Sequence, residues 1–190
     1  VVADAVSTAY QAVLRAGARA GDAVFVVGAG GVGGFLTQIA GALGARVVAC
    51  DVSPERLESA GRYGAEHTVN VTDRDLREVR KEIRGVAREW GIPSLRWRIF
   101  ECSGTASGQL LAYALLSHAA TLVQVGYTFD KVTVRLSNLM AYDATVHGTW
   151  GCPPEVFPQV LAMIYDGRVV LEPFVDRAPM SELGKLLDDM

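Results

Sequence analysis

Residues 23–43, AVFVVGAGGVGGFLTQIAGAL, decide the fold. A short apolar run at 23–27 leads into five glycines within the seven positions 28–34, and a helical pattern follows over 32–43. Glycine loses more conformational freedom on folding than any other residue, so such a cluster at the start of a helix needs a steric reason. We infer that a ligand approaches this backbone so closely that side chains are excluded.

The spacing of the glycines predicts what that ligand is. Gly28, Gly30 and Gly33 match the pattern G-x-G-x-x-G, directly after a strand and directly before a helix. In this pattern Gly28 permits a tight turn, Gly30 lets a pyrophosphate approach the backbone, and Gly33 lets the helix pack on the strand. The anion then lies at the helix N-terminus, where N–H groups and the positive end of the dipole favour it. A tight turn without a ligand is the alternative.

Asp51 predicts which dinucleotide binds. It follows the next apolar strand pattern, 46–50, at the spacing expected of a residue that contacts a ribose. A carboxylate there accepts hydrogen bonds from both ribose hydroxyls of NAD and repels the 2′-phosphate of NADP. The sequence therefore predicts NAD as cofactor. Arg56, in the following helix, either contacts the ribose edge or is an ordinary solvated residue.

The remaining pattern predicts an α/β fold with a doubly wound parallel sheet, the Rossmann arrangement. Short apolar runs alternate with helical stretches, and such alternation gives parallel strands joined by right-handed crossovers. Because no repeat or linker interrupts it, we expect a single dinucleotide-binding domain over 1–190, with a leading helix over 1–17 in which Thr8 and Gln11 have capping-box spacing. The expected strands are 23–27, 46–50, 67–70, 97–101 and 121–125, and the expected helices are 32–43, 54–63, 75–90 and 106–117.

Composition excludes several classes of protein. The chain has 190 residues, of which 50% are hydrophobic, and a formal net charge of -3, which argues against a nucleic-acid partner. No apolar run reaches the roughly 18 residues of a membrane span, and nothing at the start resembles a signal peptide. Cys50, Cys102 and Cys152 form no CxxC pair, as expected in a reducing compartment. We therefore expect a cytoplasmic protein that binds neither membrane nor nucleic acid.

Along nearly its full length the chain resembles the nucleotide-binding domain of the zinc-type, medium-chain alcohol dehydrogenases. The stretches that carry the resemblance, in that family's order, are DAVSTAYQAV (4–13), VFVVGAGGVGG (24–34), VVACDVSPERL (47–57), ECSGT (101–105), LVQVG (122–126) and VHGTWG (146–151). The tail also resembles the family's, which implies a return strand over 170–175 followed by a helix to the chain end. The resemblance implies an NAD-dependent oxidoreductase that takes hydride from a secondary alcohol.

The resemblance also implies further cofactor contacts. Gly31 joins the glycine loop, Val32 lies behind the nicotinamide, and Ser103 with Gly104 borders the adenosine and the nicotinamide ribose. The groups that would hold the carboxamide through the backbone are Val125, Gly126, Tyr127, Thr149 and Trp150. Thr8 matches a position near the nicotinamide ring, or is only a helix cap.

The same resemblance implies zinc in the full-length enzyme. In that family a GroES-like domain carries most of the zinc site and the main catalytic residues, and we expect that this domain is absent from the chain, which alone would be inactive. By position Asp4 would supply the third protein ligand, where many members have Cys. Carboxylate oxygen is a suitable zinc ligand. Alternatively, Asp4 only lies near a helix N-terminus, where a negative charge is favourable.

Two stretches have a narrower resemblance. WRIFECSGTASGQ (97–109) and RLSNLMAYDATVHGTWGCPPEVFPQVL (135–161) resemble the 6-hydroxycyclohex-1-ene-1-carbonyl-CoA dehydrogenases of anaerobic aromatic degradation. This implies a CoA thioester, a cyclic hydroxyacyl-CoA, as the small-molecule substrate. Family members also pair through the edge of this sheet, which implies a homo-oligomer.

Two other functions remain open. One is a zinc-free, NADPH-dependent quinone or enone reductase of the same superfamily, against which Asp51 and Asp4 both argue. The other is a regulatory module that senses NAD and has no chemistry of its own. The sequence of this chain leaves the exact substrate undetermined.

Other polar residues have ordinary interpretations. His67 and His118 have no ligand spacing, so we expect no metal or catalytic role for them. Arg77, Lys81, Arg84 and Arg88 form one stripe of a helix, opposite Leu76, Val79 and Ile83, which predicts a solvated basic face. Contact with a CoA phosphate is the alternative for this stripe.

Overall fold

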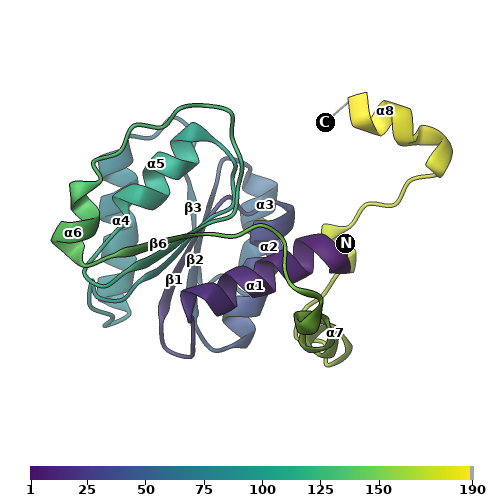
Figure 1. The fold of residues 1–190 in the computed structure, drawn as a ribbon, viewed down its shortest axis with the longest axis horizontal. Helices are drawn as coiled ribbons and strands as arrows, with labels where there is room; N and C mark the ends of the chain where they lie inside the picture. The colour runs from purple at the N-terminus through teal and green to yellow at the C-terminus, as the bar shows by residue number, and fades with distance from the viewer. Residues whose placement is uncertain (189–190) are drawn as a thin grey trace.

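The computed structural model describes residues 1–188 and contains a six-stranded parallel sheet between two layers of helices (Figure 1). The strand order is β3-β2-β1-β4-β5-β6, the doubly wound order of Rossmann folds. The strands are β1 (Ala23–Val27), β2 (Arg46–Asp51), β3 (His67–Asn70), β4 (Arg98–Glu101), β5 (Thr121–Gln124) and β6 (Thr145–Gly148). The predicted α/β fold class is confirmed.

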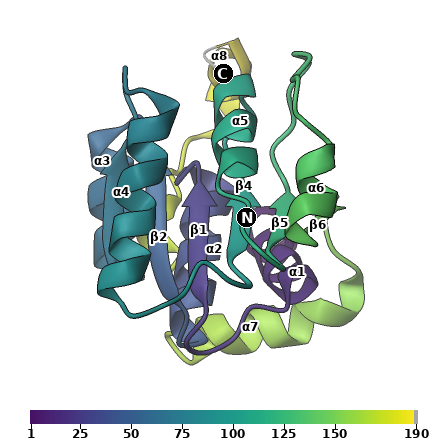
Figure 2. The same ribbon diagram turned by 90° about the vertical axis from the view of Figure 1, so that its left-hand side faces the viewer.

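The helices cover both faces of the sheet. In Figure 1, α1, α2 and α3 lie on one side, and α4, α5 and α6 lie on the other, which faces the viewer in Figure 2. The helices are α1 (Ser7–Ala16), α2 (Gly31–Ala42), α3 (Pro54–Arg62), α4 (Leu76–Glu89), α5 (Ala106–Ala114), α6 (Ser137–Tyr142), α7 (Phe157–Tyr165) and α8 (Leu183–Asp188). α7 lies beside α1, whereas α8 stands off from both layers (Figure 1).

Alternating side chains of β1 divide the core into two clusters. Val24 and Val26 pack with α1 and α2, while Phe25 and Val27 pack with α4 and α5. All five β1 residues are buried, because a parallel strand covered by helices on both faces has no solvated side. The central strand is therefore fixed from both faces, and its carboxyl end is a rigid base for the loop that follows.

Side-chain caps fix where three of the helices begin. The Ser53 side chain accepts a hydrogen bond from the backbone N–H of Arg56, Asp75 accepts from Arg77, and Thr105 accepts from Gly108. Each cap satisfies one of the N–H groups that a helix start leaves without an intrahelical partner. The helices α3, α4 and α5 thus begin just beyond the carboxyl ends of the strands.

Several expected boundaries are wrong. The leading helix starts as a π-helical turn, Val2–Val6, so Thr8 lies inside a helix and is not a cap. α5 ends at Ala114, three residues before the expected end, and α6 and α7 are helices that are not among those expected from the sequence. Within residues 1–188 no helix is long and apolar enough to cross a membrane.

The expected return strand over 170–175 is also wrong, because this segment contains a 3-10 turn, Glu172–Phe174. The side-chain amide of Gln38 takes the place of a neighbouring strand. It accepts a hydrogen bond from Val170 N at 2.7 Å and donates one to Val170 O at 3.1 Å. The expected terminal helix is present as α8, and its last expected residues, 189–190, lie outside the described residues.

Candidate functional site

The glycine loop between β1 and α2 shows a different steric reason at each of three positions. Gly28 has φ +91°, and a Cβ there would lie 2.5 Å from Ser103 N. A Cβ on Gly33 would overlap the carbonyl oxygen of Gly28, so Gly33 lets α2 pack against the turn. A Cβ on Gly30 would meet only the guanidinium of Arg56, at 3.7 Å. Protein atoms therefore explain Gly28 and Gly33, whereas the space beside Gly30 is open to a ligand.

Asp51 ends β2 next to this loop and holds it in place. Its Oδ2 accepts a hydrogen bond from Ala29 N at 2.7 Å, and its Oδ1 accepts one from Ser53 N at 2.9 Å. The side chain is 4% exposed and lies 3.9 Å from Arg56 Nη1, which is mostly exposed. Each carboxylate oxygen has a second lone pair that can accept a further hydrogen bond. Asp51 can thus bind a ligand hydroxyl while it also fixes the backbone of the glycine loop.

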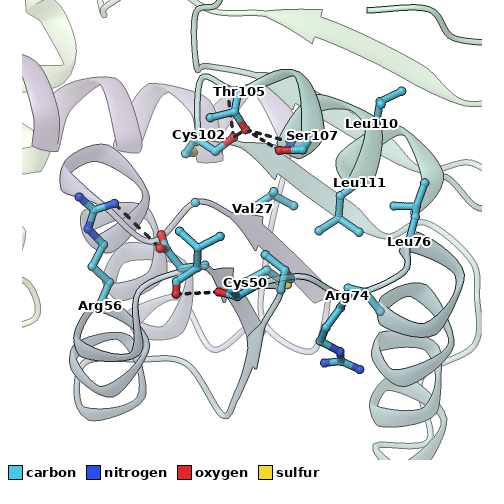
Figure 3. A pocket seen from close by; sticks show the side chains of 18 of the residues that line it. Val27, Cys50, Arg56, Arg74, Leu76, Cys102, Thr105, Ser107, Leu110 and Leu111 are labelled. Atoms are coloured by element: carbon cyan, nitrogen blue, oxygen red, sulfur yellow. Dashed lines mark hydrogen bonds and ion pairs between the residues drawn. The ribbon is translucent and has the colours of Figure 1, made fainter.

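A cavity of about 570 Å³ opens where the carboxyl ends of β1, β2 and β4 meet, and Figure 3 shows it from close by. The strand order reverses at β1, and open α/β sheets bind ligands at such a switch point. In Figure 3, Arg56 lies at one side and Leu76 and Leu110 at the other. Residues lining the cavity include Gly28, Gly30, Asp51, Val52, Arg56, Thr72, Arg74, Leu76, Cys102, Ser103, Thr105, Ser107, Leu110 and Leu111. The volume lies within the range typical of small-molecule sites.

Sequence reasoning missed the polar centre behind this cavity, the side chain of Glu101. The residue is fully buried at the end of β4, and its Oε1 accepts hydrogen bonds from Ser103 N at 2.8 Å and Gly104 N at 3.2 Å. Its Oε2 accepts one at 2.6 Å from the amide of Gln124, which also donates to Gly126 O at 2.7 Å. One carboxylate therefore fixes both loops, 103–105 and 125–127. A glutamate within the buried run RIFE was the signal that could have revealed it.

The residues expected around the nicotinamide lie outside the lining of the cavity. Gly104 and Gly126 are packed so closely that a Cβ on Gly126 would overlap Gly104 N. Tyr127 and Trp150 are exposed, the latter by 91%. Thr149 Oγ1 is buried and has no hydrogen-bond partner among the described residues. The structure thus brings together Gly28, Gly30, Asp51, Arg56 and Ser103 in one cavity and leaves Thr8, Gly31, Val32, Gly33, Gly104, Val125, Gly126, Tyr127, Thr149 and Trp150 outside its lining.

The described residues do not fit a complete zinc site. Among residues 1–188 no group of three or more His, Cys, Asp and Glu side chains is placed to hold a metal ion. Asp4 is exposed on the π-helical turn, and its Oδ1 accepts a hydrogen bond from Thr8 Oγ1 at 3.2 Å. A catalytic zinc takes three protein ligands, so Asp4 supplies at most one of them. Thr8 is here the partner of Asp4.

The two cysteines of the cavity are protected from ionisation. Burial raises the pKa of the Cys50 thiol to about 12, with smaller contributions from the negative charges of Glu82 and Asp51. Burial also raises the pKa of Cys102, and the charge of Glu101 adds to the effect. Because the thiolate is the nucleophile, neither residue is suited to covalent catalysis. Cys50, Cys102 and Cys152 are all free thiols.

The histidines considered in the sequence lie away from the cavity. His67 Nε2 is 3.5 Å from Glu82 Oε1, and His118 packs edge-on against Tyr142. The expected basic stripe on α4 is only partly correct. Arg77 and Arg88 are exposed, but Arg84 is half-buried, and Leu76, expected in the core, is 38% exposed and lines the cavity.

The strand order, the glycine turn after β1 and the cavity at the switch point define a Rossmann domain. Comparison with known proteins identifies the family. The model of the zinc-binding dehydrogenases matches residues 31–166, and the chain belongs to this family. It is 30% identical over 172 residues to the sorbitol dehydrogenase of Gallus gallus, and the aligned region covers 89% of this chain and 46% of that protein.

Solved structures agree on the fold. The alcohol dehydrogenase of Aeropyrum pernix superposes with a TM-score of 0.84 at 25% identity, over 98% of this chain and 52% of that one. A zinc-binding dehydrogenase structure from Sinorhizobium meliloti 1021 that contains NADP has a TM-score of 0.79 at 22% identity, over 90% of this chain and 49% of that one, which shows the fold alone. The chain thus spans about half the length of the proteins it matches.

Proposed function

We propose that this chain binds NAD and presents it for hydride transfer from a secondary alcohol. The observation that carries the proposal is the cavity beside Gly30, where a side chain would meet little protein and where Asp51 offers an acceptor to a ribose. α2 begins at Gly31, directly after Gly30, and the N–H groups of its first turn lack intrahelical partners. An anion is favoured there by these donors and by the helix dipole.

The rest of the cavity suits an adenosine. Val52 and Leu110 both line the cavity and supply apolar surface, and the lining also includes Asp51. Cofactor sites combine such apolar walls with a few polar groups that fix orientation. In this arrangement the adenine lies between the apolar walls, the ribose diol donates to Asp51, and the pyrophosphate lies beside Gly30.

The nicotinamide would extend toward the loops that Glu101 and Gln124 fix. The unpartnered hydroxyl of Thr149 supports this placement, because a buried polar atom costs free energy until it is paired and a carboxamide could pair it. When bound, the cofactor supplies the hydride chemistry, and the chain supplies orientation. Holding the ring in one place converts an encounter between two molecules into a step within one complex.

For substrate, we propose a secondary alcohol, as the names of the related sorbitol and alcohol dehydrogenases suggest. The finer proposal, a cyclic hydroxyacyl-CoA, rests on the resemblance of 97–109 and 135–161 alone. Oxidation of a hydroxyacyl-CoA in preference to sorbitol by the zinc-loaded full-length enzyme would support it. The reverse preference would contradict it. We also propose pairing of two copies along β6, one of the two edge strands, where Val146 is 41% exposed.

The test of the cofactor proposal is a calorimetric titration of this chain with NAD and with NADP. We expect NAD to bind at least about tenfold more tightly, a difference of about 1.4 kcal/mol, because the buried Asp51 carboxylate repels a 2′-phosphate. Asp51→Ala should reduce the difference between the affinities for NAD and NADP. Asp166→Ala is the matched control, since Asp166 is an exposed carboxylate paired with Arg168. Equal affinities of the unaltered chain for NAD and NADP would contradict the proposal that NAD is the cofactor.

Asp4 is tested separately from the cofactor. We propose that it supplies one zinc ligand in the full-length enzyme, so this chain alone should lose zinc on dialysis. Asp4→Ala in the full-length enzyme should lower both zinc content and activity. If Asp4 only stabilises the helix start, the substitution should cost roughly 0.5–1 kcal/mol of stability and leave the metal content unchanged.

A further inference from the structure

Two partly buried arginines, Arg80 and Arg84, lie four residues apart on α4. The Nε atoms of Arg80 and Arg84 are buried and have no hydrogen-bond partner within residues 1–188. Neither guanidinium forms one of the ion pairs found in that part of the chain. Burial lowers the pKa of Arg84, and the like charge of Arg80 lowers it further. Two neighbouring cations are therefore partly removed from water without an ion-pair partner among the described residues.

A second cavity, of about 270 Å³, opens beside Arg80. Arg80 lines one wall, and Arg135 lines the wall formed by the loop before α6. The hydroxyl of Tyr113 donates to the carbonyl of Arg135 at 2.6 Å, which holds this loop over α5. The lining combines these two guanidinium groups with one amide, two phenols and one aliphatic hydroxyl, which belong to Asn138, Tyr113, Tyr142 and Thr133.

We propose that this second cavity binds a small phosphate, either inorganic phosphate or a phosphate monoester, with Arg80 and Arg135 as its direct contacts. Arginine presents planar N–H donors that match phosphate oxygens, and charge-assisted bonds of this kind are the strongest hydrogen bonds available to a protein. A dianion neutralises both contacting cations and reduces the repulsion between Arg80 and Arg84. Asn138 supplies an uncharged donor to the same ligand.

The dimensions and the charge of the surroundings favour a small ligand over a nucleic acid. A polyanion is held by an extended basic surface. Here the chain carries a net charge of -3, and Glu78 and Glu82 interrupt the arginines of α4. Leu76 and Leu110 line both cavities and separate them, so a phosphate in the second cavity is distinct from one beside Gly30. The proposal does not depend on cofactor binding.

The test is a titration of the ¹⁵N-labelled chain with inorganic phosphate and with glycerol phosphate, followed by NMR at low salt. We expect saturable shifts of the amides of residues 133–138 with a dissociation constant on the order of 1 mM or tighter. Shifts of the amides of 29–31 report any phosphate in the first cavity and are analysed separately. Binding of inorganic phosphate alone, or of both compounds, supports the proposal and identifies the source of the phosphate.

Matched variants decide whether the arginines are responsible. Arg80→Gln and Arg135→Gln should each weaken binding at 133–138 by about tenfold, because each removes one charge-assisted contact. Arg88→Gln, an exposed arginine on the same helix, should change it less than about twofold, since screened surface charges contribute little. An unchanged spectrum elsewhere shows that the variants fold.

Four results would overturn the proposal. The first is an absence of saturable shifts at 133–138, and the second is an equal loss in Arg88→Gln. The third is an equal response to chloride at the same ionic strength, which would indicate an adventitious ion only. Displacement of phosphate by a single-stranded oligonucleotide at micromolar concentration would show a nucleic-acid surface instead.

Discussion

Gly30→Val tests whether the space beside the glycine loop belongs to a ligand. Gly30 precedes the first helical residue of α2 with φ −70°, which a side-chain-bearing residue can adopt, and a Cβ there would touch only Arg56, at 3.7 Å. Because valine is a poor N-cap, we expect the free energy of unfolding to fall by no more than about 1 kcal/mol. The fold should therefore persist in this variant.

The same substitution should abolish tight binding of NAD. A valine fills the space that the pyrophosphate must occupy and keeps it from the N–H groups at the start of α2. Hydrogen bonds to a charged group contribute about 1.5–3 kcal/mol each, so the loss of two gives at least about 3 kcal/mol, or more than 100-fold in affinity. Calorimetry measures the affinity, and urea unfolding measures the stability.

Gly85→Val is the matched control for this experiment. Gly85 lies in α4, where a Cβ would meet nothing within 4 Å, and it does not line the cavity. We expect its affinity for NAD to equal that of the unaltered chain. If Gly30→Val folds and binds NAD as tightly as the control, the reasoning about the loop is refuted.

Three further substitutions test the surroundings of the cavity. Gly33→Ala would push a methyl group into the Gly28 carbonyl oxygen, so urea unfolding should show that the free energy of unfolding falls by about 3 kcal/mol. A fall of less than about 1 kcal/mol would contradict the packing role of Gly33. Glu101→Gln places an N–H₂ group against a hydrogen-bond donor, so it should lower the free energy of unfolding by about 1–3 kcal/mol and weaken NAD binding. An unchanged free energy of unfolding and an unchanged affinity for NAD would argue against the positioning role of Glu101. For Cys50, the folded state keeps the thiol proton that the unfolded state loses, so stability should fall as pH rises from 9.0 toward about 12, and Cys50→Ala should flatten this dependence. An identical dependence in Cys50→Ala would contradict this assignment.

The sequence predicted five strands and the glycine turn well because these depend on local pattern, whereas β6 is not among the expected strands. β1 and β3 have the predicted bounds, and α2 begins one residue earlier than predicted. Continuous apolar runs read as buried parallel strands, and a glycine pattern between strand and helix specifies its own turn. The return strand predicted over 170–175 does not form, because the structure of this segment depends on a distant partner. The side-chain amide of Gln38 pairs with Val170, which is 132 residues away in the sequence.

The sequence predicts the part of the candidate site that depends on local spacing. Gly28, Gly30 and Asp51 occur in a spacing that local reasoning can interpret, and they lie in one cavity. Leu76 and Leu110 come from two helices whose approach only the fold determines. Asp51 also has a second role that spacing did not reveal, since it accepts a hydrogen bond from Ala29, 22 residues earlier. Helical periodicity places Arg84 on a solvated stripe, whereas the fold buries it in part, because periodicity carries no information about tertiary contacts.

A crystal structure of this chain grown with NAD tests the central claim most directly. It should show the adenosine in the cavity between Val52 and Leu110, the ribose hydroxyls within hydrogen-bond distance of Asp51, and the pyrophosphate beside Gly30 at the start of α2. A dinucleotide bound elsewhere on the chain, or an empty cavity at NAD concentrations well above the calorimetric dissociation constant, would contradict the account.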